Sequence, residues 1–279
     1  MQRLRKKPET RQYETLSRTF SDFKSAQDVN DTWLTAIEKW LIEFGGAFAI
    51  VFIVGMAIVH DLSIPMIAAT FGAVTSVLYM VYDEQHFNPF LTLQAWMFDI
   101  VNGQTKGTYN VVISLIHVLW IWSLQLVGSI LGAVALSWAF NDKQSVGATI
   151  PVDGLAGDRV IFYEFVASFF FGMIIFSLSL QNHINPNEAI HGIQFILIQK
   201  LIMPIAAGLV IFIATATIFP YTGASINFIR SIGPAIISKN THYLGYVFLG
   251  QLIGYVSAGS ILNITYLFRT WTNQKRLTA

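Results

Sequence analysis

The sequence predicts an all-α integral membrane protein, with six transmembrane helices and two half-helices in an inverted repeat. Three observations lead to this prediction. The composition is 54% hydrophobic and 12% charged, and the mean hydropathy is +0.55. The apolar residues gather in six runs of membrane-spanning length. Two shorter segments, each containing an asparagine that can head a helix, interrupt these runs in the two halves of the chain.

Six apolar runs are long enough to cross a bilayer, whose core needs about 20 apolar residues of helix. The third run is longer than this, which suits a tilted helix with a lead-in. The second and third runs carry no charge, and Pro220 is expected to stop the fifth. The predicted spans lie at about 40–60, 64–82, within 108–140, and at about 160–181, 198–219 and 243–267.

The segment GASINFIRSIGPA, residues 223–235, lies between the last two spans and contains an arginine. Arginine at membrane depth is costly and usually faces a cavity or a pathway. Asn227 is a good N-cap, because its side chain satisfies backbone N–H groups left free at a helix start. We therefore expect a short helix over about 227–237 that begins inside the membrane, with Arg230 in its first turn. Such a break is tolerated only where the backbone lines a cavity or is buried in protein.

The segment HFNPFLTL, residues 86–93, has a similar design. Asn88 is again a cap, and Pro89 suits the first helical position. A second half-helix is expected over about 88–100. Two half-helices in two halves of an apolar chain predict an inverted repeat with a site at the membrane midplane.

Spans one and four begin alike, with EFGGAFAIVF from Glu43 and EFVASFFFGM from Glu164. A buried carboxylate needs partners, and backbone N–H groups of loops are natural ones. A proton or cation site is the alternative. We favour structural buried acids, because both copies have the acid and neither has a basic residue in its own span.

Glycines predict where helices cross closely. Gly128 and Gly132 form a GxxxG pair, as do Gly250 and Gly254. Small residues at this spacing allow two helix backbones to approach each other.

Other chemistry finds little support in the composition. The net charge of +1 gives no electrostatic basis for a nucleic-acid partner, and there is no cysteine. A metal site needs convergent ligands, and no histidine pair at helical spacing faces a carboxylate. No phosphate loop or nucleophile motif is present, so we expect no enzyme, no cofactor and no metal. The histidines considered were His86, His117, His183 and His191.

The two asparagine segments resemble those of major intrinsic proteins, the aquaporins and glycerol channels. That family typically reads H-x-N-P-A-V-T-L in the first segment and G-x-x-x-N-P-A-R-S-x-G-P-A in the second. Both NPA triplets are altered here, to Asn88-Pro89-Phe90 and Asn227-Phe228-Ile229, so the chain resembles an atypical member over roughly residues 40–268. The matching residues are His86, Asn88, Pro89, Thr92, Leu93, Gly223, Asn227, Arg230, Ser231, Gly233, Pro234 and Ala235.

The resemblance implies a pore whose midplane lies at the two triplets. Asn88 and Asn227 would cap their helices and offer an N–H to a passing water. Such a water turns its hydrogens outward, which breaks a proton-conducting chain, as described for aquaporin-type pores in general. The ring of Phe90 would either crowd this midplane or face neighbouring helices, and the sequence leaves both readings open.

The resemblance also implies a selectivity filter on the outer side. Arg230 would stand there with Thr215 of the fifth span and Ala224 of the loop. In span two, the pattern of a small residue before Phe-Gly favours Phe71, whereas the usual spacing from the first asparagine gives Ala68. We prefer Phe71.

The implied function is a membrane channel for passive, proton-excluding water permeation, with small neutral solutes as further candidate permeants. One alternative is a glycerol, urea or ammonia facilitator, which the wider opening at Thr215 and Ala224 favours. Another is a poorly conducting or gated structural homologue, which Phe90 and Phe228 favour. His86 is a candidate gating residue, because histidine titrates near neutral pH. The implied partners are water, small neutral solutes, the lipid bilayer and further copies in a homotetramer.

Basic residues gather before the first span and after the last, which predicts that both termini are cytosolic. We expect a cytosolic tail over 1–38, a channel domain over 39–268 and a cytosolic tail over 269–279. The repeats of the channel domain would cover about 39–140 and 159–268. Which membrane houses the protein cannot be read from the sequence.

Overall fold

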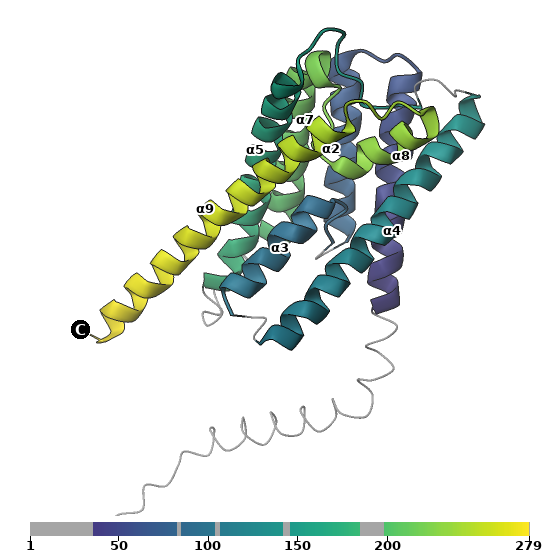
Figure 1. Cartoon of the computed structure of the whole chain (residues 1–279). Coiled ribbons are helices and arrows are strands. Elements are labelled where there is room, and N and C mark those ends of the chain that lie inside the picture. Colours follow the sequence, from purple (N-terminus) through teal and green to yellow (C-terminus); the bar gives the residue numbers. More distant parts are fainter. Residues whose placement is uncertain (1–35, 83–84, 104–106, 142–145, 185–197, 279) are drawn as a thin grey trace, which may run out of the picture. The chain divides into compact units, whose positions relative to one another are not determined.

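The computed structural model describes residues 36–82, 85–103, 107–141, 146–184 and 198–278. These ranges are almost entirely helical (Figure 1). The first span is Ala36–Val59. It is followed by α2 (Ile64–Val81), α3 (Pro89–Val101), α4 (Thr108–Phe140), α5 (Gly157–Ile184), the π-helical turn η1 (Ile198–Ile202), α7 (Met203–Thr222), α8 (Phe228–Ser238) and α9 (Leu244–Thr278). Residues Ile42–Ala279 form one compact unit.

Six of the described helices are long and apolar enough to cross a membrane, as the sequence predicts. They also expose large apolar side chains, such as Trp138 and Ile264, which are 86% and 67% accessible. Exposed apolar surface on this scale suits contact with lipid rather than water. The protein is therefore an integral multi-pass membrane protein. The spanning helices are Ala36–Val59, Ile64–Val81, Thr108–Phe140, Gly157–Leu178, Lys200–Thr222 and Leu244–Thr272.

The fifth span does not stop at Pro220, contrary to the prediction. Helix α7 continues through this proline to Thr222. Gly223 ends it in the left-handed conformation, with φ at 78°, and its N–H bonds to the carbonyl of Phe219. A glycine adopts this conformation without a steric penalty and commonly ends a helix. The glycine therefore sets the boundary.

Both predicted GxxxG pairs lie at close helix crossings. A Cβ added to Gly128 would lie 2.3 Å from the carbonyl oxygen of Phe44 in the first span. A Cβ added to Gly254 would lie 2.7 Å from the carbonyl oxygen of Phe165 in α5. Each repeat thus packs its first span against its last one through glycines.

Each half-helix packs against a long helix of the other repeat. Helix α3 packs against α9 as well as α4, and α8 packs against α4. The second spans of the two repeats, α2 and α7, also pack together. The hydroxyl of Ser76 there donates to the carbonyl of Pro204 at 3.0 Å. This packing places the first turns of α3 and α8 between the repeats.

Candidate functional site

Both half-helices begin where the sequence predicts. Helix α3 starts at Pro89, and the Oδ1 atom of Asn88 accepts the N–H of Phe90 at 3.0 Å. Helix α8 starts at Phe228, and the Oδ1 atom of Asn227 accepts the N–H of Ile229 at 3.2 Å. An asparagine cap therefore starts α8 without a proline at its first position.

The starts of the two half-helices are joined by reciprocal hydrogen bonds. The amide nitrogen of Asn227 donates to the carbonyl of Phe87 at 2.6 Å. That of Asn88 donates to the carbonyl of Ile226 at 3.4 Å. Phe87 and Ile226 both have positive φ, 51° and 55°, which is unusual for bulky residues. Two helix N-termini, each with a partial positive charge, therefore meet at one place.

Glu43 holds the loop that precedes α3. Its carboxylate is buried and accepts the backbone N–H groups of His86 at 2.7 Å and Phe87 at 2.9 Å. The side-chain amide of Gln125 in α4 donates to the same carboxylate at 2.8 Å. These bonds fix the backbone in front of the Asn88 cap, including the residue with positive φ.

Glu164 does the same for the loop that precedes α8. It accepts the backbone N–H groups of Ser225 at 3.0 Å and Ile226 at 2.9 Å. The side chains of Gln251 and Thr222 donate to it at 3.0 Å and 2.8 Å. The two repeats thus share one arrangement of an acid, a glutamine and two loop N–H groups. These contacts support a structural role for both acids.

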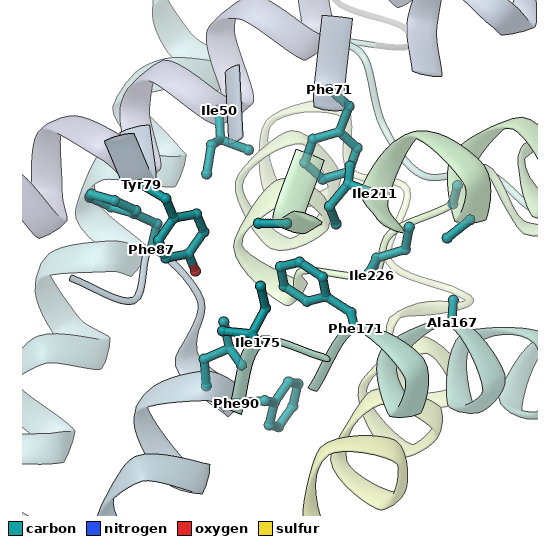
Figure 2. Packing of buried hydrophobic residues seen from close by; sticks show 14 of the residues in the cluster. Ile50, Phe71, Tyr79, Phe87, Phe90, Ala167, Phe171, Ile175, Ile211 and Ile226 are labelled. Atoms are coloured by element: carbon teal, nitrogen blue, oxygen red, sulfur yellow. The ribbon is translucent and has the colours of Figure 1, made fainter. Parts of the chain in front are cut away.

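A small cavity lies beside both asparagines. The volume open to the centre of a water-sized sphere is about 10 Å³, which is about the minimum for one water molecule. Figure 2 shows several of the apolar side chains that narrow it. Phe71 lines the cavity, whereas Ala68 is not among the described lining residues. The lining residues are Ile50, Phe71, Thr75, Leu78, Tyr79, His86, Phe87, Asn88, Phe171, Ile211 and Asn227.

The other residues proposed for the filter are buried as well. Arg230 is 2% accessible, Thr215 is 1% and Ala224 is fully covered. The Nη1 atom of Arg230 donates to the hydroxyl of Thr149, a loop residue that the sequence analysis missed because no motif marks it. Among the described residues, neither the Nε atom of Arg230 nor the hydroxyl of Thr215 has a hydrogen-bond partner. Buried polar atoms normally have a hydrogen-bond partner, and a water molecule in a pore would supply one to each of these two atoms.

Phe90 does not face the cavity, because it is not among the described residues that line it. Its ring contacts the rings of Trp122, Phe228 and Phe248, with centroids 5.2–6.3 Å apart. It also stacks on Tyr255, with centroids 5.8 Å apart and planes 20° apart. Of the two readings of this ring, the one in which it faces neighbouring helices agrees with the structure.

Tyr255 is a further polar residue of the site that sequence reasoning missed. It lies in α9 and is fully buried. Its hydroxyl accepts the amide of Asn88 at 2.8 Å and donates to the carbonyl of Ile226 at 2.8 Å. In the sequence it is one aromatic residue among many in an apolar span, and nothing marks it as a partner of the half-helices.

His86 is among the residues that line the cavity. Its Nδ1 atom is 3.9 Å from the Oε1 atom of Glu43. Its backbone carbonyl accepts the hydroxyl of Tyr79 at 2.7 Å. Its acidic neighbours Asp83 and Glu84 lie outside the described residues.

The described ranges contain no group of three or more His, Asp or Glu residues placed to hold a metal ion. Some of the residues considered in the sequence lie outside the described ranges. Most of the tail over 1–38 and the linker residue His191 lie outside the described ranges, and the side chain of His183 is not described.

Comparisons with known proteins agree with this geometry. The family model described as Major intrinsic protein matches residues 32–262. A probable aquaporin TIP3-2 from Arabidopsis thaliana is 27% identical over 188 residues, which are 67% of this chain and 60% of that protein. Aquaporin-1 from Rhizophagus irregularis is 30% identical over 151 residues, 50% of this chain and 49% of that protein. The matches thus span less than two thirds of either relative.

A solved structure shows the same fold. The chain resembles the X-ray structure of the aquaglyceroporin from Plasmodium falciparum, with a TM-score of 0.61. The alignment covers 81% of this chain and 95% of that one, at 15% sequence identity. At this identity the likeness concerns the fold alone.

Proposed function

Because the chain belongs to the major intrinsic protein family, we propose that it is a membrane channel that conducts water passively and excludes protons. One observation carries the proposal. The two half-helix N-termini meet beside a cavity with room for about one water molecule. A single water held next to converging positive helix ends cannot easily pass on a proton.

Proton exclusion rests on two further groups. The amide of Asn227 carries two N–H groups, and one of them donates to the carbonyl of Phe87. The other N–H donates to no acceptor among the described residues. This N–H can donate to a water in the cavity. The buried guanidinium of Arg230 adds a fixed positive charge, which repels cations and hydronium.

The size of the cavity favours water over larger solutes. Phe71, Phe171 and Ile211 line it, and the rings would have to move before glycerol could pass. A glycerol, urea or ammonia facilitator is the second candidate, because Thr215 and Ala224 are small side chains that would leave a wider opening at the proposed filter. A gated or poorly conducting homologue is the third, and the narrowness of the cavity is the observation that favours it.

Stopped-flow shrinkage of proteoliposomes, with water or glycerol as the permeant, separates these candidates. We expect water flux above that of empty vesicles with little glycerol flux. Phe71→Ala should admit glycerol, because it removes a wall of the cavity. Phe162→Ala is the matched control, since this ring is 61% exposed on the surface of α5 and should leave both fluxes unchanged.

Each outcome of this assay points to one candidate. Fast glycerol flux through the unmodified protein would favour the facilitator. Absence of both fluxes from a folded protein would contradict conduction under those conditions and favour the gated homologue.

We propose the organisation of the chain from its sequence and family. Residues 39–268 form the channel domain, and both tails, 1–38 and 269–279, face the cytosol. The channel assembles as a homotetramer with one pore per subunit. Chemical crosslinking in vesicles and protease access to the tails from either side test these statements.

A further inference from the structure

Three hydroxyl groups join the side chain of Arg230 to the start of α8. The Nη1 atom of Arg230 donates to the hydroxyl of Thr149. That hydroxyl lies 2.5 Å from the hydroxyl of Ser231, which donates to the hydroxyl of Ser225 at 2.5 Å. The hydroxyl of Ser225 donates to the backbone carbonyl of Asn227 at 3.2 Å. The chain therefore runs from the arginine of the proposed filter to the residue that caps the half-helix.

Each bond of this chain has only one possible direction. A hydroxyl carries a single hydrogen, and a carbonyl only accepts. The hydrogen of Ser225 goes to the carbonyl, so Ser231 must donate to Ser225. The hydrogen of Ser231 is then used as well, so Thr149 must donate to Ser231. The oxygen of Thr149 is thereby left as an acceptor for the guanidinium of Arg230, which carries donors alone.

The loop that carries Thr149 is itself fixed against the end of α7. The N–H of Val152 donates to the carbonyl of Tyr221 at 2.9 Å. A Cβ added to Gly223 would lie 3.0 Å from the nitrogen of Ile150 and 3.3 Å from the Cα atom of Thr149. This close approach holds Thr149 beside the turn that leads to α8.

The first half-helix has a different arrangement. Three residues after its asparagine stands Leu91 instead of an arginine, and the hydroxyl of Thr92 donates back to the carbonyl of Asn88 at 3.1 Å. Ser231, at the same position of α8, reaches across to Ser225 instead. A hydroxyl chain that only supported a helix start would be expected in both repeats. Among the described residues it occurs only at the half-helix that carries an arginine, which indicates that it serves that side chain.

We propose that Ser225 and Ser231 are positioning residues that orient the guanidinium of Arg230 through the hydroxyl of Thr149. This inference rests on the proposed channel, in which Arg230 stands at the filter. Both serines are fully buried, and hydrogen bonds that follow one another in a buried chain polarise and strengthen each other. Loss of the bond at Ser225 should therefore weaken the bond at Arg230. A guanidinium that turns more freely leaves a wider filter.

The test measures how fast the guanidinium hydrogens of Arg230 exchange with water, by NMR on arginine-labelled protein in lipid nanodiscs. Arg230→Val removes one set of signals and so assigns it. Thr149→Val removes the hydroxyl at nearly constant volume and should speed the exchange by at least about fivefold, the change expected for one ordinary hydrogen bond. Thr149→Ser keeps the hydroxyl and should leave the exchange close to that of the unmodified protein.

The variant at the far end of the chain separates this proposal from a simple contact. Ser225→Ala should also speed the exchange of Arg230, although no bond joins these two residues in the described structure. Ser231→Ala tests the same link one bond nearer. Ser76→Ala is the matched control, because its hydroxyl also donates to a backbone carbonyl, that of Pro204 at 3.0 Å, but belongs to the contact of α2 with α7. It should leave the exchange of Arg230 unchanged.

Glycerol and water flux are measured on the same variants. Faster exchange of Arg230 in both Thr149→Val and Ser225→Ala, together with a higher ratio of glycerol to water flux, supports the proposal. Unchanged exchange in a folded Ser225→Ala protein would overturn it, because the effect would then be confined to the direct contact with Thr149. Unchanged exchange in Thr149→Val would overturn it as well, even if Ser225→Ala failed to fold. Absence of flux from all variants counts against water conduction instead, and the exchange rates still decide the role of the hydroxyl chain.

Discussion

Replacing Glu164 by glutamine tests whether the buried acids serve the fold. Each carboxylate oxygen of Glu164 accepts one loop N–H, from Ser225 and Ile226. Whichever way a glutamine amide is turned, its NH2 group faces one of these donors. One charge-assisted bond, worth about 1.5–3 kcal/mol, is lost, and a buried donor is left unpaired at a cost of about 1–3 kcal/mol. Removing the buried charge offsets part of this loss, so we expect the free energy of unfolding to fall by about 2–4 kcal/mol.

Unfolding by SDS in mixed micelles, followed by tryptophan fluorescence, measures this change. Glu43→Gln should cost a similar amount, because Glu43 accepts the equivalent loop N–H groups. Asp158→Asn is the matched control at an exposed acid of the same helix as Glu164, where a charge near the helix start contributes less than about 1 kcal/mol. Unfolding of Glu164→Gln within about 1 kcal/mol of the unmodified protein would refute the structural reasoning. A change only in the pH dependence of flux would instead identify a proton site.

Three further predictions concern the filter, the altered triplet and a helix crossing. Arg230→Val should raise leakage of protons or larger solutes in proteoliposomes, and unchanged selectivity would remove Arg230 from the filter. Phe90→Ala should lower the free energy of unfolding by about 3–5 kcal/mol, because removal of a buried ring leaves a cavity. It should not raise water flux, because Phe90 does not line the cavity beside the two asparagines. A rise in flux would contradict this placement. Gly128→Ala should destabilise the protein in the same SDS assay, because its Cβ would lie 2.3 Å from the carbonyl of Phe44. Gly45→Ala is its control, with nothing within 4 Å of the added atom, and equal effects of the two changes would argue against the crossing.

Local chemistry made the helices predictable from the sequence. The spans follow from apolar length alone. Asn88 and Asn227 identify the half-helix starts, because a cap acts on a backbone N–H two residues along the chain. The prediction at Pro220 fails for a local reason as well, because Gly223 with its positive φ, and not the proline, ends the helix.

Convergence of distant segments made the rest unpredictable. Thr149 reaches Arg230 from a loop that is 81 positions away in sequence. Tyr255 reaches Asn88 across 167 positions. A threonine in a loop and a tyrosine in an apolar span are ordinary by composition, so only the packed structure identifies them as partners. The same holds for Phe90, whose direction depends on the four rings around it.

The altered triplets indicate which parts of this design the fold needs. Proline is present at the first position of α3 and absent from that of α8, yet both helices begin directly after an asparagine cap. What the two starts share is the cap and the acid that holds the loop in front of it. The positive φ of Phe87 and Ile226 is unfavourable for bulky residues, and bonds from the two loops to Glu43 and Glu164 maintain it. The acids and the asparagines thus determine the geometry of the midplane. The residues after the two asparagines differ between the two starts, and the ring of Phe90 packs on Tyr255, whose hydroxyl accepts the amide of Asn88.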